Sequence, residues 1–127
     1  MPYLLHHLHL LCSNMERTEK FFMDAFGARL VERRKFGTAD GAVLDLNGIK
    51  INLRKRAENE EVMGDVSQTR YGYHHLGLQV KDLDAAYQDL KRKGVLFTIP
   101  PREGHAGRMA FLVGPDNITI ELFQPAS

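Results

Sequence analysis

The 127-residue chain contains a single cysteine, Cys12, and no tryptophan, and its net charge is close to zero. One cysteine excludes an intrachain disulfide, so a cytoplasmic, reducing compartment is the simplest expectation. With 17 basic and 16 acidic residues the formal charge is only +1, and no block of like charge indicates nucleic acid or an anionic membrane as a partner. The apolar run Leu4 to Cys12 is interrupted by histidines and is too short to span a bilayer. We therefore expect an ordinary folded domain without a membrane anchor.

What the sequence does contain is an internal repeat. The stretch HHLHLLCSNMERTEKFF, which starts at His6, aligns with HHLGLQVKDLDAAYQDL, which starts at His74. Further along, NGIKINLRKRA from Asn47 aligns with DNITIELFQPA from Asp116, at a shift that is one residue larger. Two separated blocks at nearly the same shift indicate two copies of one module. The copies cover about residues 1–57 and 73–127, with a polar connector at about 58–72.

Each copy begins with an apolar run typical of a strand, Leu4 to Leu11 and Tyr73 to Val80, and continues with apolar residues at helical spacing. Ser13 and Asp82 are the predicted N-caps of the two helices. Gly27 and Gly94 suit the left-handed residue that follows a helix. Three short extended stretches follow each helix, so the order strand, helix, strand, strand, strand occurs twice. The sequence thus predicts an α+β protein of two tandem βαβββ modules.

Alternation along the strands decides which side chains share a face of the sheet. We expect the apolar residues of the first strand of each copy to lie under the helix. That leaves His7 and His9 on the opposite face in the first copy, and His75 in the second. On the same face, the last strand of each copy contributes Asn52 and Glu121, respectively.

Two imidazoles and a carboxylate at equivalent positions of a repeat form a ligand set for a divalent transition metal. The residues are His7, His75 and Glu121, with the amide of Asn52 in the fourth equivalent place. These ligand types suit Fe, Mn, Ni, Co or Zn better than Ca. Any one of these side chains taken alone is more simply interpreted as a polar residue on a wet sheet face. Their equivalence within the repeat favours the metal site.

The repeated module, the opening strands HHLHL and HHLGL, and the closing GPDNITIELFQP resemble the vicinal oxygen chelate superfamily. This group includes glyoxalase I, methylmalonyl-CoA epimerase, extradiol dioxygenases and bleomycin-binding proteins. The resemblance covers nearly the whole chain. It implies one glyoxalase-like domain, residues 1–127, whose curved mixed sheet forms a cup around a metal and is often completed in a homodimer. It matches His7, His75 and Glu121 to the family's metal positions, and Asn52 to a fourth position that is a carboxylate in glyoxalase I and an amide in the epimerases.

The resemblance implies a metal-dependent lyase or isomerase that abstracts a proton next to a carbonyl of a small or acyl-thioester substrate and stabilises the enediolate. It implies Glu121 as the metal-linked base. His9, on the same face as His7, is a second candidate for moving the proton, or simply lines a polar pocket. Leu11 stands where glyoxalase I has a glutathione-contacting arginine, which counts against a glutathione adduct as substrate. A metal-free small-molecule binding protein of the bleomycin-resistance type and an Fe(II) extradiol-type dioxygenase stay open as alternatives.

The segment from Arg102 to Arg108 contains three kinds of ionisable side chain, Arg, Glu and His, and two glycines. It is a candidate loop over the substrate, in which Arg108 meets a carboxylate or phosphate and His105 lies beside it. Asn52 is a further candidate for binding substrate. The alternative interpretation of the segment is an ordinary solvated loop.

Overall fold

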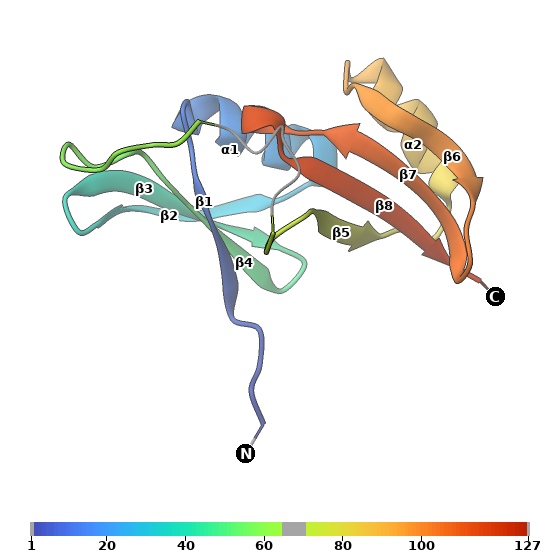
Figure 1. The fold of residues 1–127 in the computed structure, drawn as a ribbon, viewed down its shortest axis with the longest axis horizontal. Coiled ribbons are helices and arrows are strands. Elements are labelled where there is room, and N and C mark those ends of the chain that lie inside the picture. The colour runs from blue at the N-terminus through green and yellow to red at the C-terminus, as the bar shows by residue number, and fades with distance from the viewer. Residues whose placement is uncertain (1, 65–70, 127) are drawn as a thin grey trace. The chain divides into compact units, whose positions relative to one another are not determined.

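A computed structural model describes residues 2–64 and 71–126 (Figure 1). The chain divides into two compact units, Met1–Gly64 and Asp65–Ser127, called unit 1 and unit 2 below. Each unit contains one α-helix and four strands in the predicted βαβββ order, so the prediction of an α+β protein with tandem modules is confirmed. The predicted connector at 58–72 includes residues 65–70, which lie outside the described residues.

Unit 1 is a four-stranded mixed sheet with one helix. Its elements are β1 (His7–Leu11), α1 (Met15–Phe26), β2 (Arg29–Phe36), β3 (Ala39–Leu46) and β4 (Ile49–Arg54). The strand order is β1-β4-β3-β2, and only β1 and β4 run parallel. The register pairs His7 with Lys50 and His9 with Asn52.

Unit 2 repeats this plan. Its elements are β5 (Leu76–Gln79), α2 (Leu83–Arg92), β6 (Phe97–Glu103), β7 (Gly107–Val113), a 3₁₀ turn (Pro115–Asn117) and β8 (Thr119–Pro125). The strand order is β5-β8-β7-β6, with β5 and β8 parallel. Gly77 pairs with Glu121, as His9 pairs with Asn52 in unit 1.

The helices begin and end where their capping residues allow. The N-cap of α1 is Asn14, whose side-chain oxygen accepts a hydrogen bond from the Arg17 amide, so the prediction of Ser13 was wrong by one residue. An asparagine side chain can accept from an unpaired amide of the first turn as a serine does, and Asn14 has the extended backbone that the position requires. Asp82 caps α2, as predicted. Gly27 ends α1 in the left-handed conformation.

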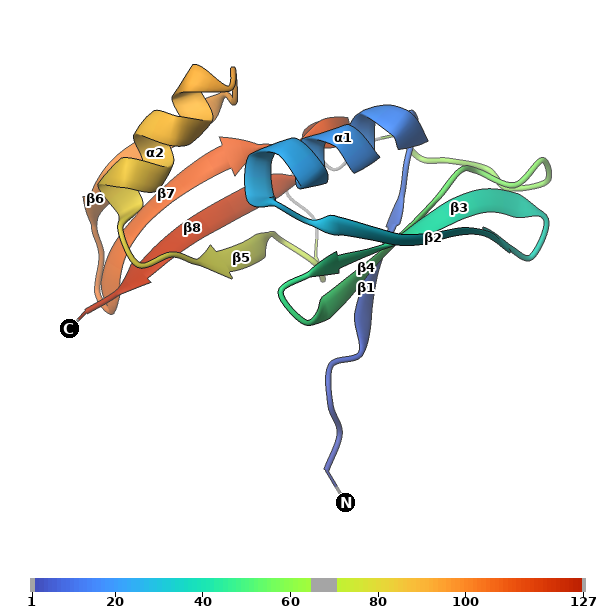
Figure 2. The ribbon, with the colours of Figure 1, turned by 180° about the vertical axis from the view of Figure 1, so that it is seen from behind.

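In each unit the helix lies across one face of the sheet (Figure 2). The apolar residues of the central strands are buried beneath it: Leu44, Ile51 and Leu53 in unit 1, and Leu112, Ile120 and Leu122 in unit 2. Each such side chain contributes roughly 1.5–3 kcal/mol through its removal from water. The face of each sheet that the helix leaves uncovered is called the open face. His7, His9 and Asn52 belong to the open face of unit 1, which confirms the predicted alternation.

Two segment boundaries differ from the predictions. The segment 102–108 is mostly strand, because β6 and β7 continue to a tight hairpin in which the Gly104 amide donates to the Gly107 carbonyl at 2.7 Å. The first strand starts at His7 instead of Leu4, because its partner β4 begins at Ile49 and leaves the earlier residues without a paired strand. Among the described residues, no helix is long and apolar enough to cross a membrane.

Candidate metal centre

His75 and Glu121 meet on the open face of unit 2. His75 directly precedes β5, and Glu121 lies in the neighbouring strand β8, where the register places it opposite Gly77. The Nε2 atom of His75 is 2.8 Å from Oε1 of Glu121. Their side chains are 30% and 17% exposed, respectively, so the pair is reachable by solvent. The predicted imidazole and carboxylate of the second copy are therefore adjacent in the fold.

The surroundings of this pair are mainly apolar. Phe111 in β7 is paired with Glu121 across the sheet, and its ring meets the His75 ring edge-on at 5.4 Å. Met109 and Phe123 pair with each other on the same face, two residues away from Phe111 and Glu121 along their strands. At Gly77 an added Cβ atom would meet no atom within 4 Å in this structure. The carboxylate thus lies beside an apolar surface with free space at the glycine.

The open face of unit 1 carries the equivalent histidine and an amide. His7 occupies the same place in the repeat as His75, and Asn52 the same place as Glu121. Asn52 is half-buried, whereas His7 is exposed at the start of β1. The amide lacks the charge of the carboxylate, so the two units offer one histidine each but only one anionic group at these positions.

His9 in unit 1 contacts an aromatic ring. Its ring meets Phe36 edge-on at 4.7 Å, and Phe36 lies close over Gly41, where a side chain would collide with it. Partial burial of the His9 imidazole, followed by the positive charges of Arg54 and His7, lowers its pKa below the ordinary 6.5. We conclude that His9 is mainly neutral near pH 7 and can accept or donate a proton.

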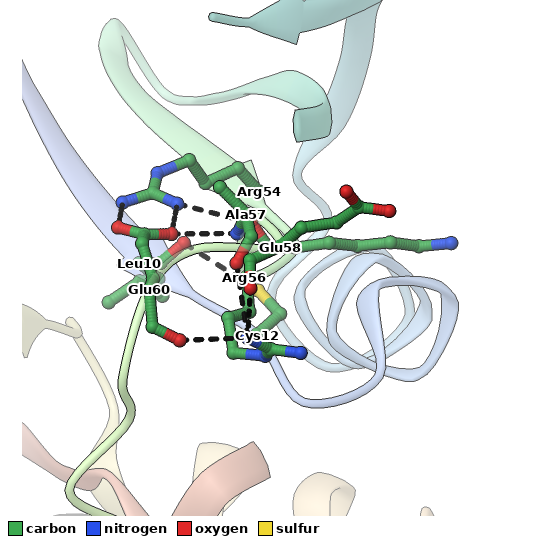
Figure 3. A network of polar contacts seen from close by, with 8 residues as sticks. Leu10, Cys12, Arg54, Arg56, Ala57, Glu58 and Glu60 are labelled. Carbon is green, nitrogen blue, oxygen red and sulfur yellow. Dashed lines mark hydrogen bonds and ion pairs between the residues drawn. The ribbon is translucent and has the colours of Figure 1, made fainter. Parts of the chain in front are cut away.

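A polar network ties the start of the connector to the end of β4 (Figure 3). Arg54 donates hydrogen bonds to both carboxylate oxygens of Glu60, at 2.5 and 2.7 Å, and the Ala57 amide donates to the same carboxylate at 2.7 Å. Arg56 donates to three main-chain carbonyls of this turn, those of Ala57, Glu58 and Glu60. The Arg54 hydrogen bonds, with that of the Ala57 amide, lower the pKa of Glu60 to about 2. Sequence reasoning missed this network, since Glu60 belongs to a stretch interpreted only as connector.

Arg108 and His105 are placed differently from the metal-centre residues. Arg108 alternates with the open-face residue Met109 and reaches α2, where its guanidinium donates two hydrogen bonds of 3.0 Å to Asp84. It also lies 3.2 Å from Glu103. Arg108 therefore forms ion pairs with two carboxylates, those of Asp84 and Glu103, on the side of the sheet that faces α2. His105 is exposed in the hairpin turn. Substrate binding by these two residues stays a prediction.

The pair in unit 2 fits a metal ion in its donor types. An imidazole nitrogen and a carboxylate oxygen lie 2.8 Å apart, within hydrogen-bond distance, and both are ligand types that divalent transition metals accept. Within residues 2–64 and within residues 71–126, no group of three or more histidine, cysteine, aspartate or glutamate side chains gathers into a metal site. His7 belongs to unit 1, and its role as a third ligand stays a prediction.

Tandem βαβββ modules with a mixed sheet in each define the glyoxalase-like class of α+β folds. A structure of a glyoxylase/bleomycin resistance protein/dioxygenase domain from Frankia sp. EAN1pec has this fold, with a TM-score of 0.82, 22% identity and 99% of each chain covered. The Glyoxalase/Bleomycin resistance protein/Dioxygenase superfamily model matches residues 4–122. The chain belongs to this superfamily, which confirms the resemblance stated from the sequence.

Two further proteins are similar to this chain. Glyoxalase I from Saccharomyces cerevisiae is 25% identical over 94% of the chain, and the chain spans only 44% of the length of that protein. A variant of the fosfomycin resistance protein FosX from Listeria monocytogenes, solved in complex with Mn(II) and a dihydroxypropylphosphonic acid, has a TM-score of 0.74 and 19% identity, with 99% of this chain and 92% of that chain covered. The FosX structure has the same fold as this chain.

Proposed function

We propose that the protein is a metal-dependent lyase or isomerase of the glyoxalase type, which removes a proton next to a carbonyl of a small or acyl-thioester substrate. The observation that carries this proposal is the contact between His75 and Glu121 on the open face of unit 2. His7 is the proposed third ligand, and Asn52 stands at the fourth equivalent position. The similarity to glyoxalase I and to a FosX protein solved with Mn(II) supports a divalent ion. The ligand types suit Fe, Mn, Ni, Co or Zn.

A divalent ion held by these residues would act as a Lewis acid on the substrate carbonyl and favour loss of the neighbouring proton. Glu121 is the proposed base, because its carboxylate lies at the site and is only 17% exposed. The apolar neighbours Phe111 and Phe123 limit the water around it, which strengthens its interaction with a substrate proton. His9 is the proposed second proton carrier, because it lies on the same open face as His7 and is paired with Asn52 across the sheet.

The open face of unit 2 also indicates the kind of substrate. Gly77 leaves space beside Glu121, and Met109, Phe111 and Phe123 supply apolar surface next to that space. This combination suits a small organic molecule with an apolar portion next to its carbonyl. The same surface supports a second candidate function, metal-free binding of an apolar small molecule, whose affinity would not change when a chelator is added.

Metal content tests the proposal. We expect about one ion per chain after loading the wild-type protein with Zn, Mn, Ni or Co, measured by elemental analysis. His75→Ala and Glu121→Gln should each lose most of this metal. Asp89→Asn is the matched control, because Asp89 is a carboxylate on α2, on the covered side of the sheet. Wild-type protein that is folded and retains less than about a tenth of an equivalent would overturn the proposal.

The reaction class is tested with the loaded protein in D₂O. We expect deuterium incorporation next to the carbonyl of hemithioacetals or acyl thioesters, detected by mass spectrometry, and its loss in Glu121→Gln. Oxygen uptake with catechols after anaerobic Fe(II) loading, without deuterium incorporation, would instead indicate a dioxygenase. We further propose a cytoplasmic homodimer, and light scattering tests the oligomeric state.

A further inference from the structure

Each proposed histidine ligand is preceded in the chain by another histidine, and the two rings are in contact in both units. In unit 2, Nδ1 of His74 lies 2.8 Å from Nδ1 of His75, with the ring planes 77° apart. In unit 1, Nδ1 of His6 lies 2.9 Å from Nδ1 of His7, with the planes 88° apart. The same nitrogen-to-nitrogen contact therefore occurs at equivalent positions of a repeat whose other open-face residues differ.

A contact between two Nδ1 atoms needs one proton between them, and its position decides what the second nitrogen can do. A neutral imidazole carries one N–H, so its other nitrogen has a free lone pair. Nε2 of His75 lies 2.8 Å from the Glu121 carboxylate, which can only accept, so in this contact the proton is on Nε2; Nδ1 of His75 faces His74. A cation bound at Nε2 would take the place of that proton, and the one N–H of a neutral His75 would then be on Nδ1, where it is donated to His74.

We propose that His74 and His6 are positioning residues, which accept the Nδ1 proton of His75 and His7 and so hold both imidazoles in the tautomer that presents Nε2 as a metal ligand. This inference rests on the proposed function, because it assigns a role toward the proposed ion. Histidine ligands commonly donate their second N–H to a carboxylate, a carbonyl or water, and this partner fixes the ring and the tautomer. Here a second imidazole takes the place of that partner.

The location of His74 and His6 argues against a role in the core. Both side chains are exposed, while the buried residues of each unit lie on the covered face of the sheet. The outer Nε2 of each can donate its proton to water, so each ring can be neutral with a lone pair at Nδ1. Removing either side chain should leave the fold intact and change only the orientation and tautomer of the next histidine.

Affinity for Zn²⁺ alone, measured by competition with a chromophoric chelator, tests the proposal on the 127-residue chain. His74→Leu has a similar volume, cannot accept a hydrogen bond and keeps water from the vacated place, so we expect affinity to fall about 10- to 100-fold. In His74→Asn the side-chain oxygen occupies the position of Nδ1, and affinity should stay within about threefold of wild type. His6→Leu and His6→Asn should behave as a second matched pair. Circular dichroism confirms that each variant is folded.

The position of the proton is read directly from ¹⁵N-labelled, Zn²⁺-loaded protein. We expect the N–H proton on Nδ1 of His75, with a scalar coupling across the hydrogen bond to Nδ1 of His74. A proton on His74 Nδ1, or equal Zn²⁺ affinity in wild type and both leucine variants, would overturn the proposal while leaving the metal site in place. Absence of Zn²⁺ binding by wild type would overturn the proposed function, and this inference with it.

Discussion

Leu53 in unit 1 and Leu122 in unit 2 stand at the same place in the repeat, and both are buried beneath a helix. On the open faces, equivalent positions carry different side chains. The differing pairs are His9 and Gly77, Asn52 and Glu121, and Arg54 and Phe123. Unit 1 therefore presents a polar open face, and unit 2 presents a carboxylate within an apolar one. The first histidine of each face, His7 or His75, is the same in both.

This difference follows from the physical demands on the two faces. A residue under the helix must be apolar and of the right volume, since close-packed interiors tolerate little change. A residue on the open face has only to be compatible with a strand, so its chemistry can change without loss of the fold. The duplicated module thus keeps one core and allows two chemically distinct surfaces.

The largest expected effect tests whether the two cores are equivalent. Leu53→Ala and Leu122→Ala should each reduce the free energy of unfolding by about 2–5 kcal/mol, because each removes a fully buried side chain and leaves a cavity. Denaturant unfolding followed by circular dichroism measures both. Leu96→Ala, at a side chain that is 67% exposed, is the control and should change little. A large effect at one leucine and a negligible effect at the other would show that the cores are not equivalent.

A smaller effect should distinguish the open faces. In Gly41→Ala the new methyl group would meet the ring of Phe36 and, at 2.5 Å, the main-chain oxygen of Leu53, so we expect a loss of about 1–3 kcal/mol. Gly77→Ala meets no atom within 4 Å in this structure and should be close to neutral. Thermal unfolding of the two variants measures the contrast. Equal destabilisation would mean that the open face of unit 2 is as closely packed at its glycine as that of unit 1.

Much of the fold could be predicted from the sequence, because local rules determine it. The repeat, the alternation that separates His7 from Leu8, and the cap at Asp82 all depend on residues close together in the chain. The helix start at Asn14 was misplaced by one residue, since adjacent serine and asparagine side chains are both good caps and only the backbone decides between them.

The site could be predicted only as far as the faces of the strands. Alternation places His75 and Glu121 on one face, but their contact also depends on the parallel register of β5 and β8, which joins distant parts of the chain. The orientation of Arg108 depends on the position of Asp84 on the helix, and no local pattern signals it. The hydrogen-bonded ion pair between Arg54 and Glu60 requires the chain to fold back after β4. The polar sequence of this stretch does not predict that turn.

The smallest expected effect concerns the ion pair of Arg54 and Glu60. In unit 2, Phe123 stands at the position equivalent to Arg54. Hydrogen bonds from Arg54 and from the Ala57 amide lower the pKa of Glu60 from 4.5 to about 2, so the folded state favours the carboxylate. The contribution of ionised Glu60 to the free energy of unfolding is fully present above about pH 4.5 and is lost as the pH falls from there toward 2. Glu60→Gln should therefore unfold at a slightly lower temperature than wild type at pH 7, and the difference should shrink at pH 3.

Glu58→Gln, at an exposed carboxylate of the same turn, is the control. A Glu60→Gln difference that stayed constant between pH 7 and pH 3 would show that the pair does not contribute through the charge of Glu60, because only an ionised carboxylate gains from the Arg54 guanidinium.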